Sequence, residues 1–161
     1  MENIDDQQYE DIKCWFLNEQ ESMYAAAKYL ADDFYATRRL VRRGRSIDQH
    51  GQLNIRVRKR RKGVGVEIEY YGVRFHGNKS RTFTRHAIRK GKSDKYTMAS
   101  MNSLPWLNLT DWEWEWFREN ERKFARIRAS SKALTRLSRS FYFYQTSRNK
   151  ELNNRVMEVS R

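Results

Sequence analysis

Between Gln52 and Lys62, polar and apolar residues alternate in a way that could present hydrogen-bonding groups to a nucleic acid. An extended strand would place Leu53, Ile55 and Val57 on one face. Its other face would carry Gln52, Asn54, Arg56, Arg58 and Arg60. Gln and Asn can form paired hydrogen bonds with adenine and Arg with guanine, and a two-stranded ribbon fits the DNA major groove. The spacing therefore predicts a strand face that could read base edges.

The same arginines have an alternative role within the fold. Glu67 and Glu69 are spaced two residues apart in the next alternating segment, so a hairpin would place both carboxylates on the face that carries Arg56, Arg58 and Arg60. Cross-strand ion pairs would then occupy the guanidinium groups. The alternation is consistent with both interpretations.

Other basic residues have few acidic neighbours in the sequence and could contact phosphates. In the middle of the chain they are Arg61, Lys62, Lys79, Arg81, Arg85, Arg89, Lys90 and Lys92. A second group comprises Arg38, Arg39, Arg42, Arg43 and Arg45. Cations at the end of a helix also stabilise its dipole, but five arginines in eight residues exceed that need. Both groups are therefore assigned to nucleic-acid binding.

Charge is unevenly distributed along the chain. Residues 1–37 contain 2 basic and 9 acidic residues, residues 38–95 contain 19 and 4, and residues 96–161 contain 12 and 7, which together give the net charge of +13. Clustered cations bind nucleic acid by displacing its counterions. The middle third therefore favours nucleic acid, and duplex DNA in particular, as the partner.

An anionic membrane is the other common partner of a basic protein. No stretch reaches the roughly 20 apolar residues of a membrane span, and the acidic N-terminus lacks the basic and apolar pattern of a secretion signal. We therefore expect a cytoplasmic protein that does not bind membranes.

Residue types that support catalysis or metal binding are sparse. The single Cys and the three His lie at spacings that no common metal site uses, and no glycine-rich phosphate loop is present. We expect no catalytic residue, metal or cofactor. A nuclease is nevertheless a rival function, with a purely structural interaction protein as another. The nuclease would depend on the carboxylates of the basic segment, which are Asp48, Glu67, Glu69 and Asp94.

Aromatic residues are concentrated after the basic segment, as Trp106, Trp112, Trp114, Trp116 and Phe117. Packing in the core is the favoured interpretation. Aromatic side chains beside a basic sheet face can also stack on unpaired bases. An RNA-binding protein is therefore the alternative function.

Apolar residues recur every three or four positions from Asp5 to Val41, which predicts a long helix that could break near residues 18–22. Cys14 lies in this apolar pattern and is predicted to be buried. Strands are expected over residues 53–57 and 66–75, with Gly72 as a bulge, and over Thr82–Ile88.

Residues 91–109 are expected to form a loop, after which Thr110 and Glu113 have the spacing of a capping box that begins a second long helix. The predicted fold is α+β, with two long helices packed on one face of a small three-stranded antiparallel meander. Residues 1–148 would form a single domain, and the polar tail 149–161 is expected to fray.

The order of these elements, together with the stretch Glu121-Arg-Lys-Phe124-Ala125-Arg-Ile127-Arg128, resembles the MobI-type auxiliary mobilisation proteins of conjugative elements over roughly residues 24–140. The resemblance implies a protein that binds double-stranded DNA near an origin of transfer and helps a separate relaxase to begin processing. It implies no catalytic residue. The acidic first helix would then be the surface that contacts the relaxase.

Overall fold

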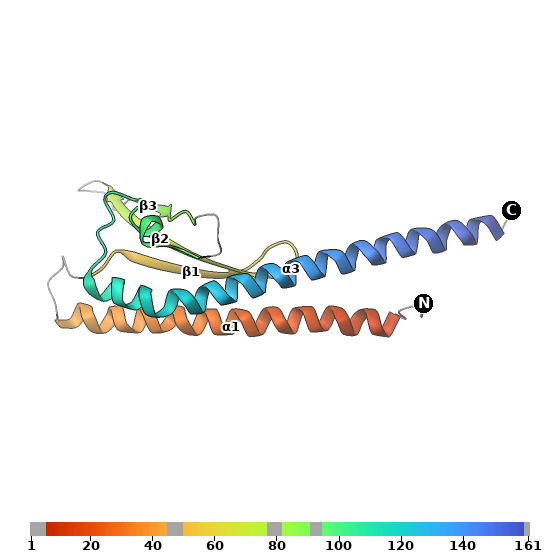
Figure 1. Cartoon of the computed structure of the whole chain (residues 1–161), viewed down its shortest axis with the longest axis horizontal. Helices are drawn as coiled ribbons and strands as arrows, with labels where there is room; N and C mark the ends of the chain where they lie inside the picture. Colours follow the sequence, from red (N-terminus) through yellow and green to blue (C-terminus); the bar gives the residue numbers. More distant parts are fainter. Residues whose placement is uncertain (1–5, 45–49, 77–81, 91–94, 160–161) are drawn as a thin grey trace.

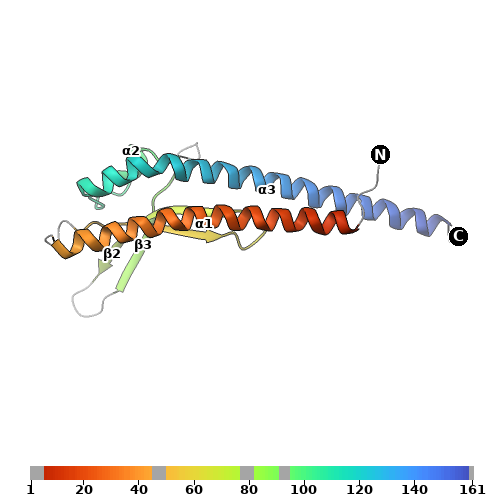
Figure 2. The ribbon, with the colours of Figure 1, turned by 90° about the horizontal axis from the view of Figure 1, so that it is seen from below.

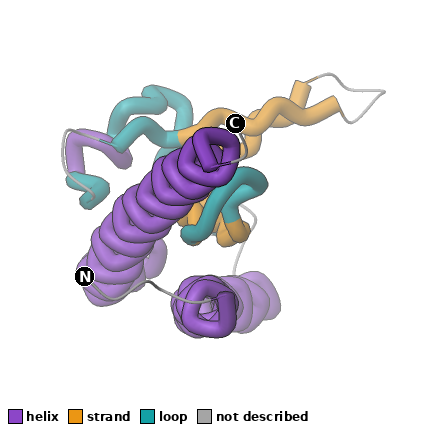
Figure 3. The backbone as a smooth tube through the Cα atoms, turned by 90° about the vertical axis from the view of Figure 1, so that its right-hand side faces the viewer, coloured by secondary structure: helices purple, strands orange, loops and turns teal. Residues whose placement is uncertain are grey.

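Two long antiparallel helices support a small sheet (Figure 1). The computed structural model describes residues 6–44, 50–76, 82–90 and 95–159. In chain order, its elements are α1 (Asp6–Gly44), β1 (Leu53–Lys59), β2 (Val66–His76), β3 (Thr82–Ala87), α2 (Met98–Met101) and α3 (Asp111–Val159). Viewed along the long axis, the strands lie to one side of the two long helices (Figure 3). The predicted α+β architecture is confirmed.

The helix α1 is continuous over 39 residues. Its buried stripe includes Phe16, Ala27, Ala31 and Phe34, and burying one large apolar side chain contributes about 1.5–3 kcal/mol. The break that we considered near residues 18–22 is absent. Gln20 lies in that turn, and its buried amide donates a 2.7 Å hydrogen bond to the carbonyl of Gly65, so this part of α1 is held against the sheet.

The sheet is an antiparallel meander in the order β1-β2-β3. Val57 pairs with Ile68 and Ile55 pairs with Tyr70, so the apolar residues of both strands share the face that contacts the helices. The predicted bulge at Gly72 is wrong, because this residue pairs in regular register with both Leu53 and His86. Gly72 instead makes room for an aromatic ring, since a Cβ atom there would lie 2.6 Å from Trp106.

Side chains from the helices cover the outer edge of β1. The hydroxyl of Tyr35 accepts from the N–H of Ile55 at 3.0 Å and donates to its carbonyl at 2.8 Å. Arg38 donates to the carbonyl of Leu53, and Glu113 accepts from the N–H of the same residue. Four backbone groups that would otherwise be open are thereby paired, which blocks the addition of another strand there.

The hairpin turn between β1 and β2 is anchored to α3. Ser131 bonds both the N–H and the carbonyl of Val66, and the hydroxyl of Thr135 donates to the carbonyl of Val64 at 2.7 Å. Gly65 has a φ of +144°, and a Cβ atom there would lie 2.8 Å from the Thr135 hydroxyl. The turn therefore depends on a glycine at this position.

The helix α3 begins where the capping box predicted. The carboxylate of Glu113 accepts the N–H of Thr110 at 2.9 Å. Before it, residues 95–109 include the short helix α2 and contribute Tyr96, Met101 and Leu107 to the core. We expected a frayed tail after residue 148, but α3 continues to Val159. No glycine or proline follows Pro105 to end the helix.

Candidate nucleic-acid interface

The predicted base-reading face of β1 is occupied by ion pairs. Arg56 lies opposite Glu69, and its Nε donates to that carboxylate at 2.9 Å. Arg58 lies opposite Glu67, with 2.5 Å between Arg58 Nε and Glu67 Oε2, and this bond raises the pKa of Arg58. Arg60 Nε lies 3.9 Å from Glu67 Oε1. The cross-strand alternative is therefore the arrangement that the structure contains.

The other polar residues expected on this face differ in their environment. The amide of Asn54 is engaged, because its Oδ1 accepts from Arg38 at 2.9 Å and its Nδ2 donates to the carbonyl of Gln52. The side chain of Gln52 is exposed. Most of this face is thus committed to contacts within the sheet and with α1.

The arginines at the end of α1 divide into two groups. Arg38 donates to the carbonyls of Gly51 and Leu53 and to Asn54. Burial, and secondarily the nearby charge of Arg42, lowers its pKa. Arg38 therefore holds the start of β1 in place. The exposed residues of this group are Arg39, Arg42 and Arg43, whereas Arg45 lies outside the described residues.

Basic residues that are not ion-paired within the described part of the chain lie near the hairpin turn and after β3. Arg61, Lys62, Arg89 and Lys90 are exposed. Arg85, in β3, is exposed but is engaged in contacts, and its guanidinium lies 5.8 Å from the ring centre of Tyr71. Of the predicted phosphate contacts, Lys79, Arg81 and Lys92 lie outside the described residues.

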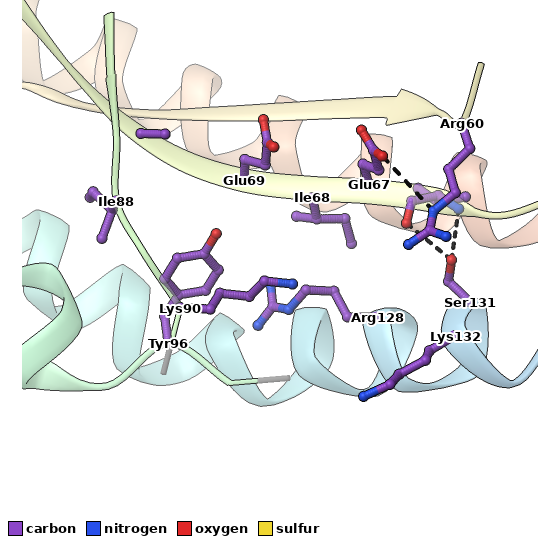
Figure 4. Close-up of a pocket in the computed structure, with 12 residues that line it drawn as sticks. Arg60, Glu67, Ile68, Glu69, Ile88, Lys90, Tyr96, Arg128, Ser131 and Lys132 are labelled. Atoms are coloured by element: carbon purple, nitrogen blue, oxygen red, sulfur yellow. Dashed lines mark hydrogen bonds and ion pairs between the residues drawn. The ribbon is translucent and has the colours of Figure 1, made fainter. Parts of the chain in front are cut away.

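A cavity of about 380 Å³ follows the edge of β2 on the side away from β1 (Figure 4). Four basic residues contribute to its lining, which are Arg60, Lys90, Arg128 and Lys132. A second cavity is lined by Arg58, Arg60, Arg61, Lys62 and Glu67. Because the two cavities share Arg60 and Glu67, they form one surface from the hairpin turn to Lys90. We call this surface the basic groove.

The edge of β2 contributes backbone groups to the basic groove. Ser131 bonds both backbone groups of Val66, and the carbonyl of Tyr70 accepts the N–H of Ile88 at 2.9 Å. Alternate residues of a strand direct these groups to the same edge. Ile68 therefore directs its N–H and carbonyl into the cavity, where no described residue bonds them. A backbone N–H beside a lysine is a suitable donor to an anion.

A buried polar cluster forms the floor of the groove. The side chains of Arg128 and Glu121 are 3% and 9% exposed and form an ion pair. The guanidinium of Arg128 also lies 5.0 Å from the ring centre of Tyr96, whose N–H donates to Glu121. Burial is the main cause of the raised pKa values of Glu121, Tyr96 and Tyr70.

Arg128 was not identified from the sequence as part of this cluster, whereas the structure buries it. The signal was present, because Glu121 and Arg128 are seven residues apart and share a helix face with Phe117 and Phe124. A charged pair inside an apolar stripe indicates a buried ion pair rather than a surface one.

The aromatic residues after the basic segment pack inside the molecule. Trp112, Trp116 and Phe117 are buried. The ring centre of Phe34 lies 5.4 Å from that of Trp112 and 4.9 Å from that of Trp116. This confirms the packing interpretation for these rings. Trp106 is half-buried beside His86.

Cys14 is exposed, so its predicted burial is wrong. The apolar stripe of α1 passes through Phe16 instead. Among the described residues, no cluster of three His, Cys, Asp or Glu side chains could hold a metal ion. None of the described helices is long and apolar enough to cross a membrane.

Comparison with known proteins identifies the family. A family model described as MobI protein matches residues 23–142. No curated protein and no solved structure matches the chain. The matched region contains the sheet, α2 and most of both long helices, and thus the whole basic groove. The chain belongs to the MobI protein family and has an accessory role in mobilisation.

Proposed function

We propose that this MobI-family protein is a non-enzymatic accessory that binds double-stranded DNA near an origin of transfer and helps a relaxase to begin mobilisation. The observation that carries the proposal is the basic groove. Arg61 and Lys62 in the hairpin turn and Lys90 after β3 border connected cavities and have no carboxylate partner among the described residues. Their side chains can displace counterions from a phosphate backbone.

The groove supports backbone contacts more than base reading. A phosphate oxygen could accept from the N–H of Ile68 while Lys90 neutralises its charge. Base reading by Arg56 and Arg58 would require both arginines to leave their glutamates. Sequence preference would then come from the shape of the DNA or from other residues.

Two rival functions receive less support from the described residues. A nuclease would use Glu67 and Glu69, but both carboxylates are paired with arginines. A single-strand or RNA binder of the predicted kind would use the aromatic residues after the basic segment for stacking, but Trp112, Trp116 and Phe117 are buried. The exposed rings Trp15, Tyr29 and Phe143 lie on the long helices. Asp48 and Asp94 lie outside the described residues.

Competition binding tests the choice of nucleic acid. Labelled duplex DNA from the region flanking the protein's own gene would be competed with unlabelled duplex DNA, single-stranded DNA and RNA of the same sequence. The proposal expects duplex DNA to compete best. Stronger competition by RNA or single-stranded DNA would replace it with the RNA-binding alternative, and magnesium-dependent cleavage of the duplex would show a nuclease.

A relaxase is the proposed protein partner, with the acidic half of α1 as its contact. Deleting residues 1–20 is unsuitable as a test, because Phe16 and Gln20 are buried against the rest of the molecule. Reversing the charge of Asp6, Glu10 and Glu19 should keep the fold, because all three side chains are exposed. Unchanged recruitment of the relaxase by that variant would remove α1 as the contact.

A further inference from the structure

One face of α1 is left uncovered by every described element. The opposite face packs on the sheet and α3, whereas Tyr29 is 75% exposed and Leu40 is 69% exposed. Figure 2 looks onto this outer face along its whole length. Trp15 and Leu17, each 48% exposed, also lie on the surface of α1, so four large apolar side chains of this helix are open to solvent. Exposed apolar surface of this kind marks a site that another protein can cover when its side chains fall on one face.

Residues on this outer face recur every three or four positions, which is the spacing of a helix that packs against another helix. In order they are Asp11, Cys14, Asn18, Ser22, Ala25, Tyr29, Asp32, Ala36, Leu40 and Arg43. Most of these side chains are small, and Tyr29 and Leu40 are the two large apolar side chains among them. A second helix could therefore approach closely and receive these two side chains.

The charge of α1 changes sign along its length. Residues 6–21 contain five acidic residues and one lysine, a net charge of −4. At the other end, Arg39, Arg42 and Arg43 are exposed and no acid lies among residues 38–43, whereas Arg38 is bonded to the start of β1. An antiparallel copy of α1 would place each acidic half beside a basic end. A parallel copy would place like charges together and Tyr29 against Tyr29.

We propose that two copies of this chain pair through the outer faces of α1 in an antiparallel arrangement, with the two-fold axis passing between Ala25 and Tyr29 of that face. In this register, the residue numbers of two residues that face each other across the interface add up to 54. Asp11 meets Arg43 of the second copy, Cys14 meets Leu40, Asn18 meets Ala36, and Ala25 meets Tyr29. Tyr29 and Leu40 each face a small side chain, and Arg43 faces an acid, so the surface is complementary to itself, as an isologous interface requires.

A second copy explains both ends of the helix. A basic partner such as a relaxase would account for the acidic half of α1 but not for Arg39, Arg42 and Arg43 at its other end. The dimer would compete with a relaxase for the acidic half of α1. It does not depend on DNA binding, because β2, whose edge lines the basic groove, lies on the other side of the molecule from the outer face of α1 (Figure 1). Failure of DNA binding therefore leaves the dimer proposal intact.

Sedimentation equilibrium tests the association directly. The wild-type chain should show a dimer whose population rises with protein concentration, and the Tyr29→Glu/Leu40→Glu variant should be monomeric. The matched control is Phe143→Glu, which alters a 76% exposed residue on α3 and should dimerise normally. A wild-type chain that stays monomeric, or a Tyr29→Glu/Leu40→Glu variant that dimerises like wild type, would overturn the proposal.

Charge exchange tests the orientation. Arg43→Asp should weaken the dimer by placing two acids together, and Arg43→Asp combined with Asp11→Arg should restore it. Circular dichroism of each variant would confirm that α1 is folded. If the double variant associates no better than Arg43→Asp alone, these two residues do not face each other.

Cys14 allows the register to be measured, because it is exposed and is the only cysteine. In the proposed dimer, Leu40→Cys should form a disulfide with Cys14 of the second copy under mild oxidation. The wild type should not cross-link, since its two Cys14 residues would be 26 positions, or about 39 Å, apart. Leu40→Cys combined with Cys14→Ser is the control and should also remain uncross-linked. Cross-linking of the wild type would instead show a parallel dimer.

Discussion

Arg56 and Arg58 show how a neighbouring strand determines which partner a charged side chain binds. In sequence, both belong to a basic block, and either DNA or a carboxylate could be their partner. The register of β1 against β2 places Glu69 and Glu67 directly opposite them. These ion pairs leave the outer face of β1 and β2 nearly neutral. The positive charge without a carboxylate partner among the described residues therefore lies at the hairpin turn and at Lys90.

Removing those carboxylates should strengthen DNA binding. In Glu67→Gln/Glu69→Gln, Arg56, Arg58 and Arg60 would become available to phosphates, so the affinity for duplex DNA should rise and its salt dependence should become steeper by up to about 0.9 for each additional phosphate neutralised. Stability should fall only slightly, because exposed ion pairs contribute about 0.2–1 kcal/mol each. Fluorescence anisotropy at several salt concentrations would measure the effect.

The control for this experiment adds the same charge elsewhere. Glu115→Gln/Glu119→Gln changes two exposed residues of α3 that lie away from the basic groove. It should raise the affinity less than Glu67→Gln/Glu69→Gln does. Equal gains in both variants would mean that DNA responds to net charge alone.

The ion pair between Glu121 and Arg128 should be important for stability. Arg128→Met would leave the carboxylate of Glu121 buried without its cation, and breaking a buried pair in this way lowers the free energy of unfolding by about 3–5 kcal/mol. Combining it with Glu121→Gln should recover part of the loss, as urea denaturation would show. A fully additive loss in the double variant would contradict the pairing.

Acidification should favour the folded state through Glu121. Burial raises the pKa of Glu121 above its ordinary 4.5, so the folded protein holds this proton more tightly than the unfolded chain does. As pH falls from the raised pKa towards 4.5, the contribution of Glu121 to the free energy of unfolding therefore increases. Arg128 lowers the pKa of Glu121, so in Arg128→Met this pKa should rise further than in the wild type. The difference in stability between the wild type and Arg128→Met should therefore shrink as pH falls from the pKa of Glu121 in the variant to its pKa in the wild type. A difference that stays constant or grows as pH is lowered towards the wild-type pKa would contradict this assignment.

Local sequence patterns predicted those features of the helices and strands that depend on residues close together in the sequence. Alternation indicated β1 and β2, the β-propensity of residues 82–88 indicated β3, and the Thr110–Glu113 spacing indicated the start of α3. The bulge at Gly72 and the burial of Cys14 were wrong because tertiary contacts decide them. Trp106 approaches Gly72 from 34 residues further along the chain, and the face that α1 buries is set by α3 and the sheet. No local pattern contains those contacts.

The contacts between helices and strands could be predicted only in part from the sequence. The four bonds that close the edge of β1 come from Tyr35, Arg38 and Glu113, which are distant in sequence and have other plausible roles. The basic groove likewise joins the hairpin turn, the segment after β3 and α3. Sequence reasoning found Arg61, Lys62 and Lys90 but not the cavities that they border.

The hairpin turn should be sensitive to substitution of Gly65. Gly65→Ala would add a Cβ atom 2.8 Å from Thr135 at a φ of +144°, and strain of this kind destabilises by roughly 1–3 kcal/mol. The control is Gly44→Ala at the end of α1, where nothing lies within 4 Å of the added atom. Thermal unfolding should show a lower Tm for Gly65→Ala alone. Equal Tm values for the two variants would show that the turn does not require glycine.

At the scale of the whole molecule, charge and shape divide the protein into two sides. The sheet side carries the basic groove, and the other side is the outer face of α1. The family match extends across both sides, from residue 23 to residue 142. The proposed DNA contact and the proposed contact with a second copy therefore lie on different sides of the molecule, and the family match covers both.

The most direct measurement is the salt dependence of duplex binding by Arg61→Ala/Lys62→Ala/Lys90→Ala, compared with Arg118→Ala/Arg122→Ala/Arg126→Ala. Each variant removes three exposed cations, the first from the basic groove and the second from the outer side of α3. The groove variant should bind weakly, and its plot of log affinity against log salt should be shallower by up to about 2.7, or 0.9 for each phosphate that is no longer neutralised. The α3 variant should keep the slope of the wild type. The same slope and the same affinity in both variants would contradict a DNA-binding groove at the turn and the edge of β2.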